Sequence, residues 1–275
     1  MSEARTTGGV LRVALHQGSA HSADVPENLR LLADAARRAA RQGARLLVCP
    51  EMSLTGYNIG DGVARSAEPA DGPMRRAVSA IAAEAGIAVL YGFPERDGPR
   101  VHNAVQLVDA RGRAAARYRK THLFGDIDRR AFAAGDTAVV QATVDGVRVG
   151  LLICYDVEFP ETVRAHALAG TELLLVPTAL MRPYEAVART LVPARAIESQ
   201  IHVAYVNRRD REGELDYCGL SCLIGPDGTE LARAGGDDEL VVADVDAERL
   251  SAARREIGYL ADRRPELYGS LADPR

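Results

Sequence analysis

Short runs of apolar residues alternate with amphipathic stretches along most of the chain. An apolar run of roughly four to eight residues between polar ones predicts a buried strand, whereas apolar positions that recur every three or four residues predict a helix. The predicted strands are residues 10–16, 45–49, 87–93, 104–108, 147–153, 173–176, 201–206 and 240–245. The predicted helices are residues 26–41, 71–86, 159–169 and 186–200.

The order of these elements indicates the fold class. Apolar strands alternate with helices early in the chain, and residues 219–224 and 229–234 flank the turn Pro226-Asp227-Gly228, which predicts a hairpin. This order predicts an α/β protein with a mixed sheet or two packed sheets. A plain parallel sheet stays an alternative, because periodicity alone does not separate the two.

Composition narrows the class of protein. At 275 residues the chain fits one large domain, and a net charge of −4 offers no basic surface for nucleic acid or anionic lipid. The polar N-terminus lacks the pattern of a signal peptide, and no apolar run is long enough to span a bilayer. Four cysteines without a CxxC pair read as reduced thiols, and no His or Cys spacing matches a zinc site. We therefore expect a cytoplasmic protein without metal or cofactor, and without nucleic-acid or membrane partners.

Three polar residues stand where apolar strand runs stop. Glu51 follows residues 46–50, Lys120 follows residues 116–119, and Cys154 follows residues 150–153. Taken singly, such a cysteine is usually a small hydrophobe, and such a glutamate or lysine is usually solvated. Taken together, they place an acid, a cation and a thiol at strand ends, where a rigid sheet holds reactive groups at its rim.

The segments around these residues carry a family resemblance. Residues 47–57 (LVCPEMSLTGY), 118–124 (YRKTHLF) and 150–156 (GLLICYD) resemble the three motifs of the nitrilase superfamily, also called carbon–nitrogen hydrolases. The similarity runs from about residue 10 to 270. It implies a four-layer αββα sandwich of two mixed β-sheets, formed by one domain over residues 1–275 with a core at about 10–248. It also implies a homodimer or higher homo-oligomer, with the tail, residues 249–275, at the interface.

The same resemblance assigns the chemistry. Cys154 would attack an amide carbonyl and form a thioester, and Glu51 would act as general base and later as acid. Lys120, helped by the helix after the cysteine, would lower the pKa of the thiol. Lys120 would also stabilise the oxyanion, with the backbone N–H of Tyr155 as a second donor. Asp128 stands where the family more often has a second glutamate; a solvated loop aspartate is the alternative.

The residues that follow Cys154 indicate the branch of the family and the class of substrate. Nitrile-cleaving members typically carry Trp after the nucleophile, whereas this chain has Tyr155-Asp156 there and no Trp at all. We therefore expect an amidase that acts on a small amide, with Glu158 disfavouring substrates that carry a carboxylate. A solvent-facing helix residue is the alternative for Glu158. The other candidate pocket walls are Tyr57, Thr178, Ala179 and Met181.

Three readings of function stay open beside the amidase. An N-carbamoyl amide hydrolase or a nitrilase would use the same three residues. A catalytically inactive binding relative is the non-enzyme alternative, although the intact Glu51, Lys120 and Cys154 argue against it.

Overall fold

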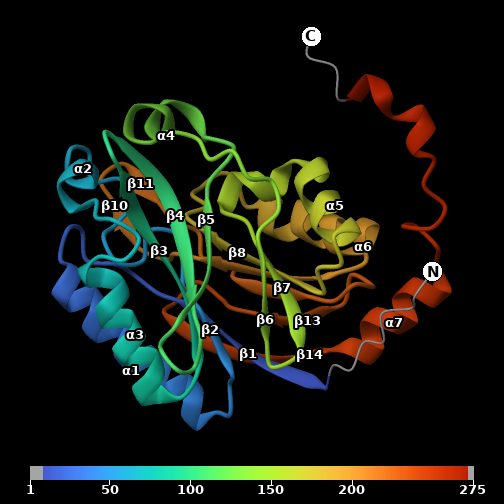
Figure 1. Cartoon of the computed structure of the whole chain (residues 1–275), viewed down its shortest axis with the longest axis horizontal. Coiled ribbons are helices and arrows are strands. Elements are labelled where there is room, and N and C mark those ends of the chain that lie inside the picture. Colours follow the sequence, from blue (N-terminus) through green and yellow to red (C-terminus); the bar gives the residue numbers. More distant parts are fainter. Residues whose placement is uncertain (1–8, 272–275) are drawn as a thin grey trace.

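The structure is a computed structural model of the chain and describes residues 9–271. Two six-stranded sheets form its centre (Figure 1). The strands of the first sheet are β1 (Val10–Gln17), β2 (Leu46–Val48), β3 (Ala88–Asp97), β4 (Arg100–Val108), β5 (Ala114–Arg119) and β14 (Glu239–Asp246). Those of the second are β6 (Gln141–Val144), β7 (Val147–Leu151), β8 (Leu173–Thr178), β9 (His202–Asn207), β12 (Cys222–Ile224) and β13 (Glu230–Arg233).

Helices cover the outer faces of both sheets (Figure 1). Helices α1 (Val25–Arg41) and α3 (Pro73–Ala85) pack on the first sheet, and α5 (Pro160–Leu168) and α6 (Val192–Ser199) pack on the second. The predicted α/β class with four αββα layers and two mixed sheets is confirmed. The smaller elements are α2 (Gly62–Ser66), α4 (Gly125–Ala131), α7 (Ala247–Glu256) and the two-stranded ribbon of β10 (Arg211–Glu212) and β11 (Leu215–Asp216).

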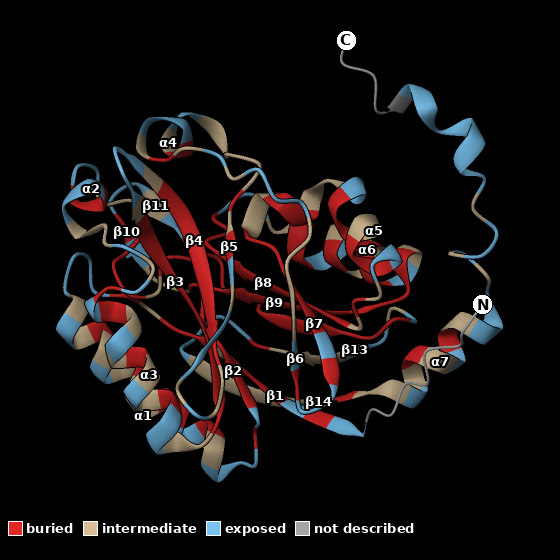
Figure 2. Cartoon of the chain, viewed as in Figure 1, coloured by how far each residue is buried: buried red, intermediate tan, exposed pale blue. Residues whose placement is uncertain are grey.

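Strand residues alternate between two cores. On β1, Leu11, Val13 and Leu15 pack toward the second sheet, whereas Ala14 packs toward α1 and α3. Because successive side chains of a strand point to opposite faces, a strand buried on both sides reads as a continuous apolar run. This is the pattern that the sequence shows, and Figure 2 confirms that buried residues concentrate in the strands of both sheets.

Strand directions bring distant segments to one edge. Strands β2 and β3 are parallel, β4 is antiparallel to β3, and β5 is antiparallel to β4. Strand β5 therefore runs in the same direction as β2, so their carboxyl ends lie at the same edge of the first sheet. In the second sheet β7 and β8 are parallel, so their carboxyl ends also share an edge. The residues that follow these strands are the candidate site residues.

Several boundaries differ from the prediction. The predicted helix 186–200 begins with a π-helical turn, Val187–Leu191, before α6, and the predicted helix 159–169 begins at Pro160 after a 3₁₀ turn, Cys154–Glu158. After α7 the chain leads away from the body of the molecule (Figure 1). Within residues 9–271, the helices are all too short or too polar to cross a bilayer.

Candidate active site

Glu51 and Lys120 meet at the edge of the first sheet. Glu51 lies in the turn after β2, and Lys120 directly follows β5. The Lys120 Nζ lies 2.9 Å from Glu51 Oε1, and both side chains are fully buried. Strand β4 fixes the start of the lysine segment, because the backbone N–H of Lys120 donates to the carbonyl of Asn103 at 2.8 Å.

Asp128 completes a buried ion cluster. It lies in α4, it is fully buried, and its Oδ2 lies 2.7 Å from Lys120 Nζ. Its carboxylate also accepts the hydroxyl of Tyr57 at 2.8 Å and the backbone N–H of Phe124 at 2.8 Å. The solvated-loop alternative for Asp128 is therefore wrong, and one ammonium is shared by two carboxylates.

Burial and charge act in opposite directions on this cluster. Burial raises the pKa of Glu51, and the ammonium of Lys120 offsets part of that rise. Burial by itself lowers the pKa of Lys120, but the surrounding groups, Glu51 first, raise it well above its ordinary value. Lys120 therefore stays protonated at neutral pH, which is what stabilisation of a developing negative charge requires.

Cys154 sits on a tight turn at the end of β7. Its φ is +47°, a left-handed conformation that non-glycine residues adopt rarely and that marks positions where neighbouring contacts enforce the backbone. The turn is held by Asp156, whose Oδ2 accepts the backbone N–H of Ile153 at 3.1 Å. This tight turn lies between β7 and α5.

The surroundings of the thiol differ from the expectation. Burial raises the pKa of Cys154 and the nearby Glu51 raises it further. Lys120, the Thr178 hydroxyl and the Ala179 backbone N–H lower it by less. Lys120 acts in the predicted direction and lowers the thiol pKa, but burial and Glu51, which the prediction left out, outweigh it. The predicted helix N-terminus does not lie at the sulfur, because α5 begins only at Pro160, beyond the turn that carries Cys154.

The residues predicted to line the substrate pocket lie near the ion cluster of Glu51, Lys120 and Asp128. Tyr57, Ala179 and Met181 are buried together in one apolar cluster, and the backbone carbonyl of Thr178 accepts the N–H of Glu51 at 3.4 Å. Tyr155 packs edge-on against two phenylalanine rings, with centroid distances of 5.3 Å to Phe124 and 4.9 Å to Phe159.

Glu158 is half-buried rather than solvent-facing. Burial raises the pKa of its carboxyl, and the charges of Lys120 and Arg195 lower it by less. The charge of Lys120 therefore contributes to the electrostatics of this carboxyl.

Sequence reasoning missed two residues that build the site. Asn103, fully buried on β4, donates from Nδ2 to Glu51 Oε1 at 2.6 Å. Its signal in the sequence was an Asn inside an apolar strand, where such a residue is rare. The predicted strand began one residue later, at Ala104.

The second residue is Asp156, which joins the lysine segment to the cysteine turn. Besides Ile153, it accepts the Tyr118 hydroxyl at 3.0 Å, and it accepts the Thr121 hydroxyl and the backbone N–H of His122, each at 2.8 Å. Its signal in the sequence was its position two residues after Cys154. There it served only to distinguish an amidase from a nitrile-cleaving member of the family.

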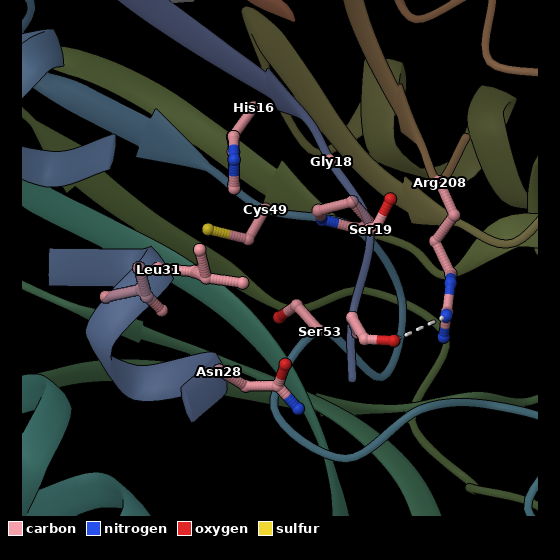
Figure 3. Close-up of a pocket in the computed structure, with 11 residues that line it drawn as sticks. His16, Gly18, Ser19, Asn28, Leu31, Cys49, Ser53 and Arg208 are labelled. Atoms are coloured by element: carbon pink, nitrogen blue, oxygen red, sulfur yellow. Dashed lines mark hydrogen bonds between the residues drawn. The ribbon is translucent and has the colours of Figure 1, made fainter. Parts of the chain in front are cut away.

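A cavity beside the turn that carries Glu51 is too small to be a substrate site. It lies between the end of β1, the start of α1 and the buried Arg208, and Cys49 and Ser53 line it (Figure 3). The dashed line in Figure 3 is the contact of the Arg208 guanidinium with the carbonyl of Ala20. Its volume of about 20 Å³ holds about one water molecule.

The described residues of the site offer acid–base and nucleophilic chemistry. Within residues 9–271, no group of three or more His, Cys, Asp or Glu side chains could hold a metal ion. A buried carboxylate, an ammonium and a thiol at strand ends are sufficient for proton transfer and nucleophilic attack on an acyl group.

Comparisons with known proteins agree with this geometry. A family model described as carbon–nitrogen hydrolase matches residues 12–255. A protein of Pseudomonas protegens described as a hydrolase in the pqqF 5′ region is 49% identical over 95% of this chain and 92% of its own. An (R)-stereoselective amidase of a Pseudomonas species is 41% identical over 83% of this chain and 82% of its own.

A solved structure gives the corresponding three-dimensional match. It is a mutant of the amidase from Nesterenkonia sp. AN1 that shows covalent addition of the acetamide moiety of fluoroacetamide at the active-site cysteine. It superimposes with a TM-score of 0.87 at 37% identity and covers 98% of this chain and 99% of its own.

Proposed function

The chain belongs to the carbon–nitrogen hydrolase family and hydrolyses amides by way of a cysteine acyl-enzyme, and we propose that Cys154, Glu51 and Lys120 carry out this reaction. The observation that carries the assignment is the buried cluster in which Lys120 Nζ contacts both Glu51 and Asp128, together with the contacts of Asp156 that join the lysine segment to the Cys154 turn. The substrate is a small carboxylic amide, and the products are the acid and ammonia or an amine.

Acylation begins with proton transfer inside the site. Glu51 takes the thiol proton while the sulfur of Cys154 bonds to the amide carbonyl carbon, and the carbonyl π electrons move to the oxygen. The oxyanion is stabilised by Lys120, which has a third N–H left after its contacts with Glu51 and Asp128, and by the backbone N–H of Tyr155. Glu51 then gives its proton to the departing nitrogen, the C–N bond breaks, and a thioester remains.

Deacylation repeats the sequence with water. Glu51 takes a proton from a water molecule, whose oxygen adds to the thioester carbonyl, and Lys120 again meets the negative charge. When this intermediate collapses, the C–S bond breaks and Glu51 returns the proton to the sulfur. The carboxylic acid leaves and the resting thiol is restored.

The carboxylate of Glu51 is suited to this shuttle. Within residues 9–271, its Oε1 has two donors whereas its buried Oε2 has no hydrogen-bond partner. An unpartnered buried carboxylate oxygen is costly unless a group or a substrate proton reaches it in the course of the reaction. Oε2 is therefore the atom assigned to receive and return the proton.

Intact-mass spectrometry tests the mechanism directly. Mixed with a panel of small amides and quenched in acid, the protein should gain the mass of the acyl group, and Cys154→Ala should not. Glu51→Gln should lower kcat/KM for hydrolysis by at least about 100-fold, within the range of general-base catalysis. Full hydrolysis by Cys154→Ala would remove the thioester mechanism.

The branch is tested by ammonia release. A nitrile, an amide and an N-carbamoyl compound that carry the same substituent are compared, and the amide should release ammonia at least 100-fold faster than the other two. Preference for the carbamoyl compound or the nitrile would assign the same three residues to one of those branches. Binding without turnover of any of the three would identify an inactive relative.

Glu158 selects between neutral and anionic amides in this proposal. A half-buried carboxylate on which the charge of Lys120 acts repels an anionic substituent, so neutral or cationic amides should be preferred. Glu158→Gln should raise kcat/KM for a dicarboxylate monoamide several-fold and leave that for a neutral amide of equal length unchanged. An unchanged ratio of the two would assign Glu158 to helix capping alone.

We also propose a homodimer built on α5 and the C-terminal tail. Exposed apolar side chains gather there, and a groove of about 700 Å³ lies between α5 and the tail. They are Leu168, Tyr259, Leu267 and Tyr268. The chain after α7 leads away from the rest of the protomer, so its exposed apolar side chains would pack against a second copy of the protein. Analytical ultracentrifugation should give a dimer, and truncation after residue 256 should give a monomer.

A cytoplasmic location completes the proposal. All four cysteines are free thiols, and the mechanism requires a reduced Cys154. Cell fractionation with a tagged chain should recover the protein with cytoplasmic markers.

A further inference from the structure

Asn103 lies outside the three family motifs and contacts both Glu51 and Lys120. Its side chain is fully buried in the first sheet, and its Nδ2 donates to Glu51 Oε1 at 2.6 Å. Its backbone carbonyl accepts the N–H of Lys120 at 2.8 Å. One strand residue therefore touches the base with its side chain and the base's cationic partner with its backbone.

The two donors saturate one oxygen of Glu51. A carboxylate oxygen offers two lone pairs in its plane, and Oε1 accepts both Lys120 Nζ at 2.9 Å and Asn103 Nδ2 at 2.6 Å. No lone pair of Oε1 is left for a further proton. Oε2, which is buried without a partner among residues 9–271, is the oxygen that remains available.

The orientation of the Asn103 amide follows from the same contact. With the amide flipped, Oδ1 would face Oε1, and two acceptors at 2.6 Å require that Glu51 carry a proton on that oxygen. An ionised Glu51 therefore selects Nδ2 as the contacting atom. A proton on Oε1 would have to displace the donor from Asn103 or from Lys120.

We propose that Asn103 is a positioning residue that confines the proton taken from the Cys154 thiol to Oε2 of Glu51. The inference rests on the proposed function, in which Glu51 exchanges that proton with the sulfur, with the leaving nitrogen and with water. Asn103 serves this role as a neutral donor, because it fills a lone pair of Oε1 without adding a charge that would neutralise the base.

Asn103→Leu removes the donor at similar volume. Without this donor the carboxylate of Glu51 is no longer held in position and Oε1 can take the proton; a misplacement of about 1 Å costs roughly 100-fold in rate, so kcat/KM should fall by roughly 10- to 100-fold. The acid limb of the kcat/KM profile should also move up by about one pH unit, because the ionised form of Glu51 loses a donor. A merely structural role would lower the folded fraction and leave the acid limb where it is in the unmodified enzyme.

Asn103→Asp provides a near-isosteric second variant. An ionised carboxylate there would repel Glu51, whereas its protonated form can donate to Oε1 as the amide does. Its activity relative to Asn103→Leu should therefore rise as the pH falls. A constant ratio of the two variants across the profile would overturn the inference, and this ratio is independent of the absolute loss of either variant.

A double-mutant cycle separates this inference from the proposed function. The readout is the alkylation rate of Cys154 by iodoacetamide on folded protein, which needs no knowledge of the natural amide. Asn103→Leu should slow alkylation about 10-fold when Glu51 is present and less than about 2-fold in a Glu51→Gln background. Equal slowing in both backgrounds would show that Asn103 does not act through Glu51.

Gln106→Leu is the matched control. Gln106 is buried on the same strand and accepts the hydroxyl of Tyr91 at 2.9 Å, away from Glu51. Its replacement should cost stability but leave the acid limb and the alkylation rate unchanged. If the unmodified enzyme hydrolysed no amide, the proposed function would fail while the alkylation cycle still decided whether Asn103 acts on Glu51.

Discussion

Gly92→Ala perturbs the turn that carries Glu51, the proposed base, without replacing any of the proposed catalytic side chains. Gly92 lies on β3, where its N–H donates to Ser53 Oγ at 3.1 Å and its carbonyl accepts the N–H of Leu54 at 3.3 Å. The turn that carries Glu51 therefore lies directly against this glycine. The φ of Gly92 lies outside the left-handed region, so an alanine there suffers from lack of space and not from backbone strain.

The size of the effect follows from the space at this position. A Cβ on Gly92 would come well inside 3.0 Å of the backbone nitrogen of Met52 and within 3.1 Å of the backbone carbon of Glu51. Backbone atoms cannot rotate away, so the turn must move by about 1 Å to restore ordinary contact. A misplacement of about 1 Å costs roughly 100-fold in rate, and overpacking costs about 1 to 3 kcal/mol of stability.

The assay is kcat/KM for amide hydrolysis, corrected for the folded fraction by urea unfolding. Gly236→Ala is the matched control, because a Cβ there meets nothing within 4 Å, and it should leave both kcat/KM and stability unchanged. Gly92→Ala with normal kcat/KM per folded molecule would refute the claim that this contact positions Glu51.

Two further predictions concern pH. Burial lowers the pKa of His166 and of His202 to about 4, so each takes up its proton more readily in the unfolded chain. Stability is therefore full above about pH 6.5 and falls toward pH 4, by about 2 kcal/mol per histidine at pH 5, which urea unfolding at pH 7 and pH 5 should show. The second concerns Tyr205, whose hydroxyl oxygen accepts the Thr178 hydroxyl at 3.0 Å and so holds the one proton that Thr178 can donate to the Cys154 sulfur. Tyr205→Phe should free this donor and lower the apparent pKa of Cys154 alkylation by roughly 0.5 to 1 pH unit, and an unchanged alkylation profile would exclude this competition.

The sequence predicted the layers of the fold and the residues at strand ends because both depend on local patterns. Apolar runs mark strands that are buried on both faces, and Glu51 and Cys154 each follow such a run, whereas Lys120 follows β5, a largely exposed edge strand. Helix α4 was missed because its seven residues carry no complete apolar period, and Asp128 was consequently left without a defined environment.

The contacts that the sequence did not predict depend on pairing between distant segments. Asn103 and Glu51 are 52 positions apart, and they meet only because β4 reaches the β2 turn across β3. The same holds for Asp156 and the hydroxyl of Tyr118, which are 38 positions apart: Tyr118 lies on β5 of the first sheet, and Asp156 lies in the turn that follows β7 of the second. The direction of the thiol pKa was missed for a related reason: charges can be counted in a sequence, whereas the desolvation of Cys154 is a property of the packed core.

In the proposed mechanism, charge balance in the buried cluster makes the reaction start from a thiol rather than from a thiolate. With Glu51 and Asp128 ionised and Lys120 protonated, the cluster carries one excess negative charge. Loss of the Cys154 proton to solvent would double that charge in a buried site, which burial opposes, whereas transfer to Glu51 leaves the total unchanged. The base must therefore accept the proton inside the site, and the ammonium of Lys120 then faces the oxyanion as new charge develops. A cation in place of Asn103 would hold Glu51 ionised too strongly to act as a base, and an anion would force a proton onto it before the substrate arrives, so a neutral donor is the side chain that this balance permits.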